Sequence, residues 1–180
     1  MQDDANERYA PPGEMVHTAE AVQAAIARQA SELRPMLKND YPLVLVLMQG
    51  AIYYAAWLTL ALEIPLELDY AHVSRYADRR HGRELVWQRP PAADLEGRSV
   101  LIVDDIYDEG LTLDAVRAAC RQAGAGRLSA AVLARKRHDR ARGAPPDSVA
   151  LEVPDRFIVG CGLDDAGRWR NLSALYALDD

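Results

Sequence analysis

Short, mainly apolar runs recur along this chain and predict buried strands. They occupy residues 42–48, 100–103, 128–133 and 149–153. Runs that lack a regular polar alternation are typical of strands that are covered on both faces, as in parallel sheets. Residues 65–73 alternate apolar and polar side chains instead, which predicts a partly exposed strand.

Helical patterns lie between these strands. Thr18 is a predicted helix start. The apolar residues after it recur at three- and four-residue spacing: Val22, Ile26, Ala30, Leu33 and Leu37. Further helices are expected at residues 52–62, which are rich in Tyr, Trp, Ala and Leu, and at residues 113–123, which Gly124 follows. The order of strands and helices predicts an α/β fold.

Residues 74–91 differ from the rest of the chain because they are mostly polar and charged. Within them, Leu85, Val86 and Trp87 predict a short returning strand. Long polar segments inside compact domains are commonly lids over a site. The segment is therefore expected to be a flexible loop, and a solvated, charged hairpin is the alternative.

Composition narrows the functional classes. The chain has 180 residues, 49% hydrophobic and 27% charged, so a single domain over residues 1–180 is expected. Its net charge of −6 argues against a nucleic acid or an anionic membrane as the main partner. The two cysteines lack CxxC spacing, which argues against a disulfide framework or a structural zinc site and favours a reducing cytoplasm. The acidic N-terminus does not resemble a signal peptide, and no apolar run is long enough to span a membrane.

The clearest chemical signal follows the second apolar run. Asp104 and Asp105 come directly after it, and Asp108, Gly110 and Thr112 precede the next helix. Open α/β sheets bind ligands at the carboxyl ends of their strands, and the amides of a turn or a helix start bind anions. This pattern predicts a sugar-phosphate site, with carboxylates on the ribose hydroxyls and backbone N–H groups on the phosphate. For the turn taken alone, an N-cap in solvent is an equal alternative.

Three other features can be explained by structure alone when each is taken by itself. Gln49 and Gly50 form a second turn between a strand and a helix, which either holds a phosphate or holds no ligand. The basic run at residues 135–142 is by itself typical of a solvated loop. Phe157, the only phenylalanine, is by default a core residue.

Residues 100–113 as a whole resemble the phosphoribosyl pyrophosphate (PRPP) signature of type I phosphoribosyltransferases. That signature is an apolar run, two acids, Ile, any residue, Asp, Thr, Gly and a Thr two residues on, and this chain departs from it at Glu109. Further resemblances lie around Gln49 and in residues 154–164, in the family's order. The similarity covers roughly residues 40–178 and is closest to the hypoxanthine-guanine phosphoribosyltransferases.

The resemblance implies the type I phosphoribosyltransferase fold, which is a central, mostly parallel sheet flanked by helices, with a small hood and a flexible active-site loop at about residues 74–91. In the family, Lys is frequent at the position of Gln49, after an unusual cis peptide, and Ser stands at the position of Arg75. The balance of charge around pyrophosphate is therefore expected to differ here. Glu109 is expected to point away from the phosphate, because two negative groups repel each other at short range.

The resemblance also implies a role for individual residues. Those implied at the ribose and its 5′-phosphate are Asp104, Asp105, Asp108, Glu109, Gly110, Leu111 and Thr112. Those implied at the pyrophosphate are Gln49, Gly50 and Arg170. Those implied at the purine are Lys136, Phe157, Ile158 and Asp164. Those implied in the flexible loop are Arg75 and Tyr76. Those implied as ligands of Mg²⁺ or its waters are Asp104, Asp105 and Asp164.

The implied reaction joins hypoxanthine or guanine to PRPP and gives IMP or GMP and pyrophosphate, with Mg²⁺ as cofactor. Asp108 is the implied base at purine N7, and Lys136 selects the 6-oxo group. The implied enzyme is a cytoplasmic homodimer or homotetramer that binds neither nucleic acid nor membrane. Two alternatives stay open: a xanthine-preferring enzyme, and a nucleotide-sensing regulatory protein on the same fold that uses the basic run to bind RNA or DNA.

Overall fold

The computed structural model describes the backbone of residues 13–78 and 82–179, and their side chains except those of residues 74–78 and 82–85. One sheet is built from β2 (Leu43–Met48), β3 (Glu67–Asp78), β4 (Gly82–Arg89), β5 (Ser99–Tyr107), β6 (Arg127–Lys136) and β7 (Ser148–Val153). A smaller sheet is built from β1 (Glu14–His17), β8 (Ile158–Val159) and β9 (Leu175–Ala177). The helices are α2 (Ala19–Leu37), α3 (Ile52–Leu62) and α4 (Leu111–Gln122).

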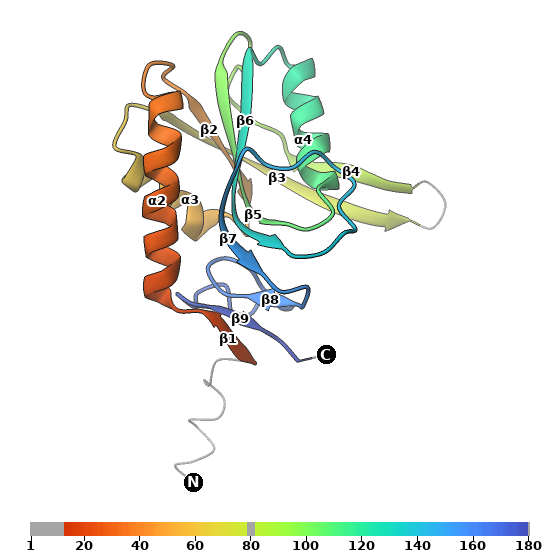
Figure 1. Cartoon of the computed structure of the whole chain (residues 1–180). Helices are drawn as coiled ribbons and strands as arrows, with labels where there is room; N and C mark the ends of the chain where they lie inside the picture. Colours follow the sequence, from red (N-terminus) through yellow and green to blue (C-terminus); the bar gives the residue numbers. More distant parts are fainter. Residues whose placement is uncertain (1–12, 79–81, 180) are drawn as a thin grey trace.

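The large sheet is mostly parallel. Its strand order is β4-β3-β2-β5-β6-β7, and every neighbouring pair from β3 to β7 is parallel, whereas β4 runs antiparallel to β3. Figure 1 shows α2 and α3 on one side of this sheet, α4 on the other, and the small sheet at one end as a hood. The predicted α/β fold, with a mostly parallel sheet flanked by helices, is confirmed.

The continuous apolar runs exist because both faces of the central strands are covered. In β2, Val44 and Val46 pack in the same buried cluster as α2 and α3. Leu43 and Leu45, which point to the opposite face, pack in the cluster that contains α4. Alternate strand residues therefore enter two cores, and both cores require apolar side chains.

Helix boundaries follow the predicted signals closely. Thr18 caps α2, because its hydroxyl oxygen accepts the amide of Ala21 at 3.2 Å. Helix α4 begins at Leu111, two residues earlier than predicted, directly after Gly110 with φ +81°. Leu111 and Thr112 therefore lie in the first helical turn, where backbone N–H groups have no partner within the helix. None of the described helices has the length and apolar character that crossing a membrane requires.

The prediction of a long polar loop at residues 74–91 is wrong for most of that segment. Residues up to Asp78 continue β3, and β4 returns antiparallel along it, with Tyr76 opposite Glu84 and Asp78 opposite Gly82. Figure 1 shows this hairpin extending away from the rest of the sheet. The reason is that an antiparallel partner supplies hydrogen bonds to the backbone whatever the polarity of the side chains. The segment is therefore closer to the charged hairpin that was the alternative.

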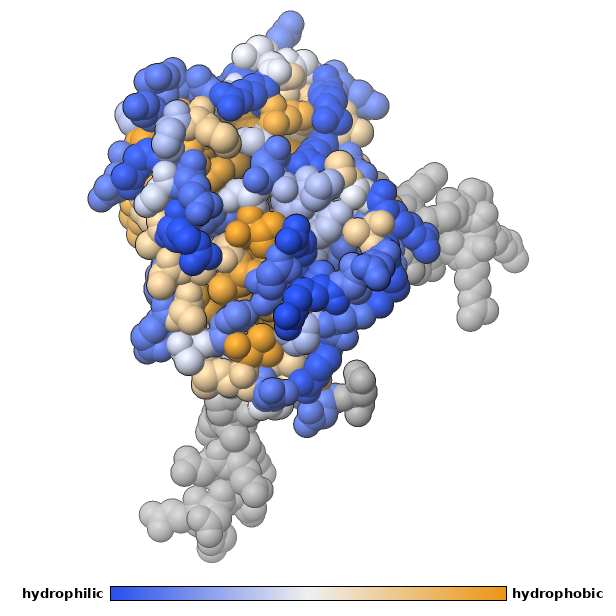
Figure 2. Space-filling model, in the orientation of Figure 1, coloured by the Kyte–Doolittle hydropathy of each residue, from blue (hydrophilic) through white to orange (hydrophobic). Residues whose placement is uncertain are grey.

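The small sheet joins the two ends of the described chain. The segment before residue 18 carries little periodicity, yet residues 14–17 form β1, which pairs with β9. Strand β9 also pairs with β8. Figure 2 shows that the face viewed in Figure 1 is largely hydrophilic, with separate hydrophobic residues visible in the upper part, the centre and the lower part of the view. The chain therefore closes its core with strands from both ends.

Replacing Tyr54 by Phe tests the packing of α3 on α2. Tyr54 is fully buried, and its hydroxyl donates to Gln29 Oε1 at 2.7 Å while Gln29 Nε2 donates to the carbonyl of Val132 at 3.2 Å. Loss of the hydroxyl leaves a buried acceptor without its donor, so Tyr54→Phe is expected to lower the free energy of unfolding by about 1–3 kcal/mol. Urea denaturation measures this change.

The control is Tyr41→Phe. Tyr41 is 57% exposed, so this change is expected to stay within about 0.5 kcal/mol. Equal effects of the two substitutions would contradict the buried hydrogen bond.

Candidate active site

A cavity of about 310 Å³ lies at the carboxyl ends of β2 and β5. It is lined by seven of the residues predicted to bind the sugar phosphate or the pyrophosphate: Gly50, Asp104, Asp105, Asp108, Glu109, Gly110 and Thr112. Leu111, also predicted there, is not among the lining residues. Ligands of open α/β sheets bind at this edge, so the cavity is the candidate site.

Asp104 and Asp105 end the buried part of β5. Asp104 Oδ1 accepts the amide of Asp105 at 3.0 Å, and Asp105 Oδ1 accepts the amide of Ile106 at 2.7 Å. Burial raises the pKa of Asp105 above its usual value, although hydrogen bonds with Asp104 and Ile106 and the charge of Arg170 act in the opposite direction. Asp105 therefore gains a proton more readily than an ordinary carboxylate.

The turn after β2 lies directly against Asp105. The peptide bond between Met48 and Gln49 is cis, as the resemblance implies, and Gln49 is exposed. A Cβ atom at Gly50 would lie 1.6 Å from Asp105 Oδ2, so only glycine fits. On the other side, a Cβ atom at Gly162 would lie 1.8 Å from the carbonyl oxygen of Gly50. The second turn that the sequence indicated thus forms part of the site.

Arg170 and Asp164 form a pair next to this turn. Arg170 Nη2 lies 2.7 Å from Asp164 Oδ1, and Arg170 Nη1 donates to the carbonyl of Gly162 at 2.6 Å. Asp164 Oδ2 accepts the amide of Gly167 at 2.6 Å. Gly50, Asp105, Asp164 and Arg170 are therefore brought together, although the sequence separates them by more than half of the chain.

Asp108 lies between two basic side chains. Its Oδ2 is 3.1 Å from Lys136 Nζ, and its Oδ1 is 2.6 Å from His138 Nε2. Burial alone would raise the pKa of Asp108, but its hydrogen bonds with His138 and Lys136 and the charge of Lys136 outweigh burial, so the pKa lies below its usual value. Asp108 is thus kept as a carboxylate, the form that accepts a proton.

His138 is the residue that sequence reasoning missed. Its side chain is only 5% exposed, whereas the run at residues 135–142 was interpreted as a solvated loop. The signal for it was the two-residue spacing from Lys136, since alternate residues of an extended chain point to the same side. Lys136 ends β6 and the amide of Arg137 still bonds to the carbonyl of Val153, so the extended geometry continues to this point.

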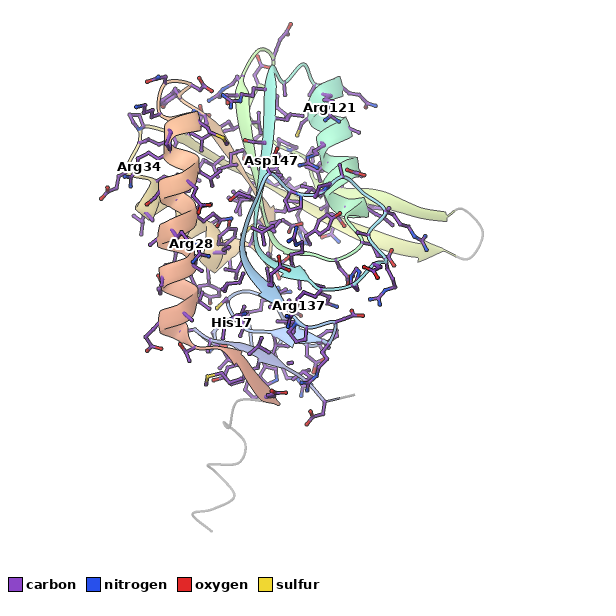
Figure 3. All side chains as sticks on the ribbon, viewed as in Figure 1. His17, Arg28, Arg34, Arg121, Arg137 and Asp147 are labelled. Atoms are coloured by element: carbon purple, nitrogen blue, oxygen red, sulfur yellow. The ribbon has the colours of Figure 1, made fainter. Side chains whose placement is uncertain are left out.

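Other basic residues of the same run also have acidic partners. Arg135 Nε donates to Glu152 Oε1 at 2.8 Å, and Arg140 Nη2 donates to Asp155 Oδ1 at 2.7 Å. Figure 3 labels Arg137, which lies near the hood. The solvated loop, which is the structural alternative for residues 135–142 taken alone, is therefore wrong for Lys136 and His138, because both side chains pair with Asp108.

The loop after β6 also supports the turn that carries Asp108. The hydroxyl of Tyr107 donates to the carbonyl of Gly143 at 2.6 Å. The amides of Arg142 and Gly143 both donate to the carbonyl of Glu109 at 3.0 Å. These bonds restrain the backbone of the turn that carries Asp108 and Glu109. The expectation that the Glu109 carboxylate points away from a phosphate stays a prediction.

The remaining predicted residues lie near the hood or outside the described side chains. Phe157 is 53% exposed, so the default interpretation of a core residue is wrong. Ile158 is 4% exposed and belongs to β8, and neither residue lines the cavity described above. The backbones of Arg75 and Tyr76 lie in β3, and their side chains are outside the described part of the structure.

The carboxylates of the site suit Mg²⁺ rather than a metal held by protein alone. Among the side chains that the structure describes, no group of three or more His, Cys, Asp or Glu is arranged to hold a metal ion. Mg²⁺ usually takes one or two carboxylates and completes its coordination with water and substrate phosphates. Asp104, Asp105 and Asp164 are oxygen donors of that kind.

Comparison with known proteins identifies relatives of the chain. Residues 12–166 match the model of the phosphoribosyl transferase domain. The hypoxanthine-guanine phosphoribosyltransferase of Bacillus subtilis is 33% identical over 154 residues, which are 85% of this chain and 86% of that protein. The enzyme of the same name from Mycobacterium tuberculosis H37Rv is 31% identical over 173 residues, 90% and 84% of the two chains. A solved hypoxanthine-guanine-xanthine phosphoribosyltransferase has a TM-score of 0.84 and 26% identity, over 93% of this chain and 97% of that one.

Gly162→Ala tests the contact between the hood and the Gly50 turn. Gly162 has φ +107°, and a Cβ atom there would collide with the carbonyl of Gly50. The substitution is expected to lower the free energy of unfolding by about 1–3 kcal/mol beyond the cost of the backbone conformation alone. Urea denaturation of this variant and of its control gives the difference in the free energy of unfolding.

The matched control is Gly97→Ala. Gly97 also has a positive φ, +68°, but a Cβ atom there meets no atom within 4 Å. It is expected to lose only the conformational cost of about 1–2 kcal/mol. If Gly162→Ala and Gly97→Ala lower the free energy of unfolding equally, the segments that contain Gly50 and Gly162 do not approach as closely as described.

Proposed function

Since the chain belongs to the phosphoribosyl transferase family, we propose that it transfers the phosphoribosyl group of PRPP to hypoxanthine or guanine. The products are IMP or GMP and pyrophosphate. The observation that carries the proposal is Asp108, held as a carboxylate by Lys136 and His138 at the end of the acidic turn. A base and a 6-oxo-selecting lysine are thereby adjacent.

The ribose phosphate is proposed to bind in the cavity of about 310 Å³. Asp104 and Asp105 hold the ribose hydroxyls and lend negative potential to the sugar as positive charge develops on it. The amides of residues 108–112 and the Thr112 hydroxyl hold the 5′-phosphate at the start of α4. Support for this assignment comes from Gly110, Leu111 and Thr112, which form the cap and first turn of that helix.

The pyrophosphate is proposed to lie against the Gly50 turn, with Gln49 and Arg170 beside it. The guanidinium of Arg170 can donate two parallel hydrogen bonds to a phosphate. Its bond to the carbonyl of Gly162 holds it near the Gly50 turn, because Gly162 lies against the carbonyl of Gly50. Asp104, Asp105 and Asp164 would hold Mg²⁺ directly or through water, and the ion would neutralise charge on the departing pyrophosphate. Arg75 and Tyr76 are proposed to cover the site from the β3–β4 hairpin.

The purine is proposed to lie between Lys136 and Phe157. Lys136 donates to the 6-oxo oxygen, a bond that the amino group of adenine cannot accept, which selects against adenine. Phe157 is exposed enough to stack on the base. The side chain of Ile158 is buried, so its contribution would come from its backbone, while Asp164 faces the pyrophosphate side.

In the proposed reaction, N9 of the purine attacks the anomeric carbon and the bond from that carbon to pyrophosphate breaks. The N7 proton passes to Asp108, which balances the charge that the purine gains. Lys136 occupies one oxygen of Asp108 in the structure. Purine binding is therefore proposed to draw Lys136 to the 6-oxo group and free that oxygen for N7.

Two alternatives remain distinguishable from this proposal. A xanthine-preferring enzyme would share the same base, lysine and ribose-phosphate site, and one structural relative is named for hypoxanthine, guanine and xanthine. A regulatory protein that binds RNA or DNA would use the basic run at residues 135–142. The acidic partners of Arg135, Lys136 and Arg140 offset part of the positive charge that this run would present to a nucleic acid.

The enzyme is proposed to be a homodimer or a homotetramer. Large apolar side chains are exposed on α3 and the adjacent part of β3: Ile52, Tyr53, Leu60, Leu68 and Tyr70. A helix with so few polar residues is usually covered on all sides. A second copy of the chain would cover this face, which we call the α3–β3 face.

One domain over residues 1–180 and a cytoplasmic location are also proposed. Both Cys120 and Cys161 are free thiols and buried, which suits a reducing compartment. Expression of the full chain with a fluorescent tag in the source cells would test the location, and a fluorescent signal outside the cytoplasm would overturn it.

Asp108→Asn tests the assignment of the base. With PRPP, Mg²⁺ and hypoxanthine or guanine, the wild-type chain is expected to show an absorbance change, and adenine is expected to give none. The variant is expected to lose about two to three orders of magnitude in kcat, because it retains the shape but not the proton acceptor. Turnover of adenine but not hypoxanthine or guanine would contradict the proposed function, and turnover of xanthine alone would favour the first alternative.

The matched control is Asp94→Asn, an exposed acid between β4 and β5 that lies outside the site. It is expected to retain wild-type kcat. Glu109→Thr, measured in the same assay, tests the orientation of Glu109. If the carboxylate points outward, KM for PRPP is expected to change by less than about twofold, and a large rise would show that Glu109 contacts PRPP.

Leu60→Lys combined with Leu68→Lys tests the α3–β3 face. The two side chains are 77% and 57% exposed, so the folded subunit tolerates the change, whereas an interface would bury two unpaired charges. Sedimentation velocity is expected to show an oligomer for wild type and a monomer for the variant. Met36→Lys on α2, where Met36 is 40% exposed, is the control and is expected to keep the oligomer. A monomeric wild type would refute the proposal.

A further inference from the structure

His138 makes the shortest contact of the Asp108 carboxylate. Its Nε2 lies 2.6 Å from Asp108 Oδ1, and its side chain is only 5% exposed. None of the roles implied by the resemblance falls on this residue. A histidine so close to the proposed base therefore calls for a role of its own.

The hydrogen bonds of the ring determine which nitrogen carries the proton. The backbone amide of Arg140 donates to His138 Nδ1 at 3.1 Å, so Nδ1 is the acceptor and Nε2 is the protonated nitrogen. Nε2 therefore donates to Asp108. The amide of Arg140 is held in turn, since the Arg140 guanidinium forms two bonds to Asp155. The ring is thus oriented from both of its nitrogens.

The two partners of Asp108 differ in what substrate binding requires of them. Lys136 is proposed to move to the 6-oxo group of the purine, which frees Asp108 Oδ2. His138 has no such second partner in the proposed complex and remains on Oδ1. A carboxylate held by one oxygen presents its other oxygen in a fixed direction, and such orientation is a large part of what a catalytic base needs.

We propose that His138 is a positioning residue, which holds Asp108 by Oδ1 so that Oδ2 faces purine N7 once Lys136 has left it. The inference rests on the proposed function. His138 is not a proton relay, because its Nε2 already carries a proton and its Nδ1 accepts the Arg140 amide. The proton from N7 ends on Asp108 Oδ2, where the N7–H bond is exchanged for an O–H bond.

The titratable and charged groups around Asp108 are Lys136, His138, Arg140, Asp155 and the neighbouring Glu109. The hydrogen bond from His138 is among the causes that lower the pKa of Asp108. Its loss therefore raises that pKa. The reaction needs Asp108 as a carboxylate. When the pH is lowered, a variant without this bond therefore loses activity at a higher pH than wild type does.

His138→Ala and His138→Gln test the inference together. With the donor lost, His138→Ala is expected to reduce kcat roughly tenfold with little change in KM for PRPP, and to move the acidic limb of the kcat profile up by about one pH unit. The amide N–H of His138→Gln replaces the donor, so most of kcat and the pH profile are expected to return. Wild-type kcat and pH profile in His138→Ala, or equal losses in both variants, would overturn the proposal.

The control and a second readout separate this inference from the proposed function. His17→Gln changes the histidine at the junction of β1 and α2 (Figure 3), whose Nε2 is 2.8 Å from the carbonyl of Glu152, and it is expected to leave kcat unchanged. Carbon-13 NMR titration of the Asp108 carboxyl requires no turnover. If wild type transfers no phosphoribosyl group, the proposed function fails. In that case, a higher Asp108 pKa in His138→Ala than in His17→Gln would still support the contact between His138 and Asp108. An unchanged pKa in an active enzyme refutes the link and leaves the function intact.

Discussion

The site depends on the parallel pairing of β2 with β5. The two strands pair from Leu43 opposite Val100 to Val46 opposite Val103, so the turns that follow them leave the sheet at the same edge. Gly50 then lies against Asp105 with no room for a side chain, and a Cβ atom at Gly162 would collide with the carbonyl oxygen of Gly50. Three segments that are remote in the sequence meet because Gly50 leaves room for the Asp105 side chain and Gly162 leaves room for the carbonyl of Gly50.

Asp105, near the end of β5, and Asp108, in the turn after it, have opposite pKa shifts for physical reasons. Burial dominates at Asp105 and raises its pKa, whereas the basic partners of Asp108 outweigh burial and lower its pKa. Neighbouring acids whose environments separate their pKa values are typical of sites that assign them different tasks. Here the lowered pKa keeps Asp108 ionised, which is the form that the proposed base requires, whereas Asp105 takes up a proton more readily.

The basic side chains of the site are neutralised by its own acids while no substrate is present. Lys136 pairs with Asp108 and Arg170 pairs with Asp164. Such partners restrain flexible side chains and keep a cluster of acids and bases folded at moderate cost. In the proposed complex, an oxo-purine would replace Asp108 as the partner of Lys136, and a pyrophosphate would replace Asp164 as the partner of Arg170.

The chain's own residue pattern determined most of the large sheet, the helix starts and the acidic turn. Strands covered on both faces need apolar runs, and caps such as Thr18 act on residues a few positions away, so these features are written locally. The resemblance carried by residues 100–113 then pointed to Asp104, Asp105, Asp108 and Thr112, which do line one cavity.

Tertiary structure alone decided the features whose partners are distant in the sequence. Strand β1 exists because β9 offers it an edge from the other end of the chain, and β3 extends because β4 pairs with it. His138 became part of the site because it meets Asp108, thirty residues away along the chain. Each of these depends on a hydrogen-bond partner that no local pattern of apolar and polar residues specifies.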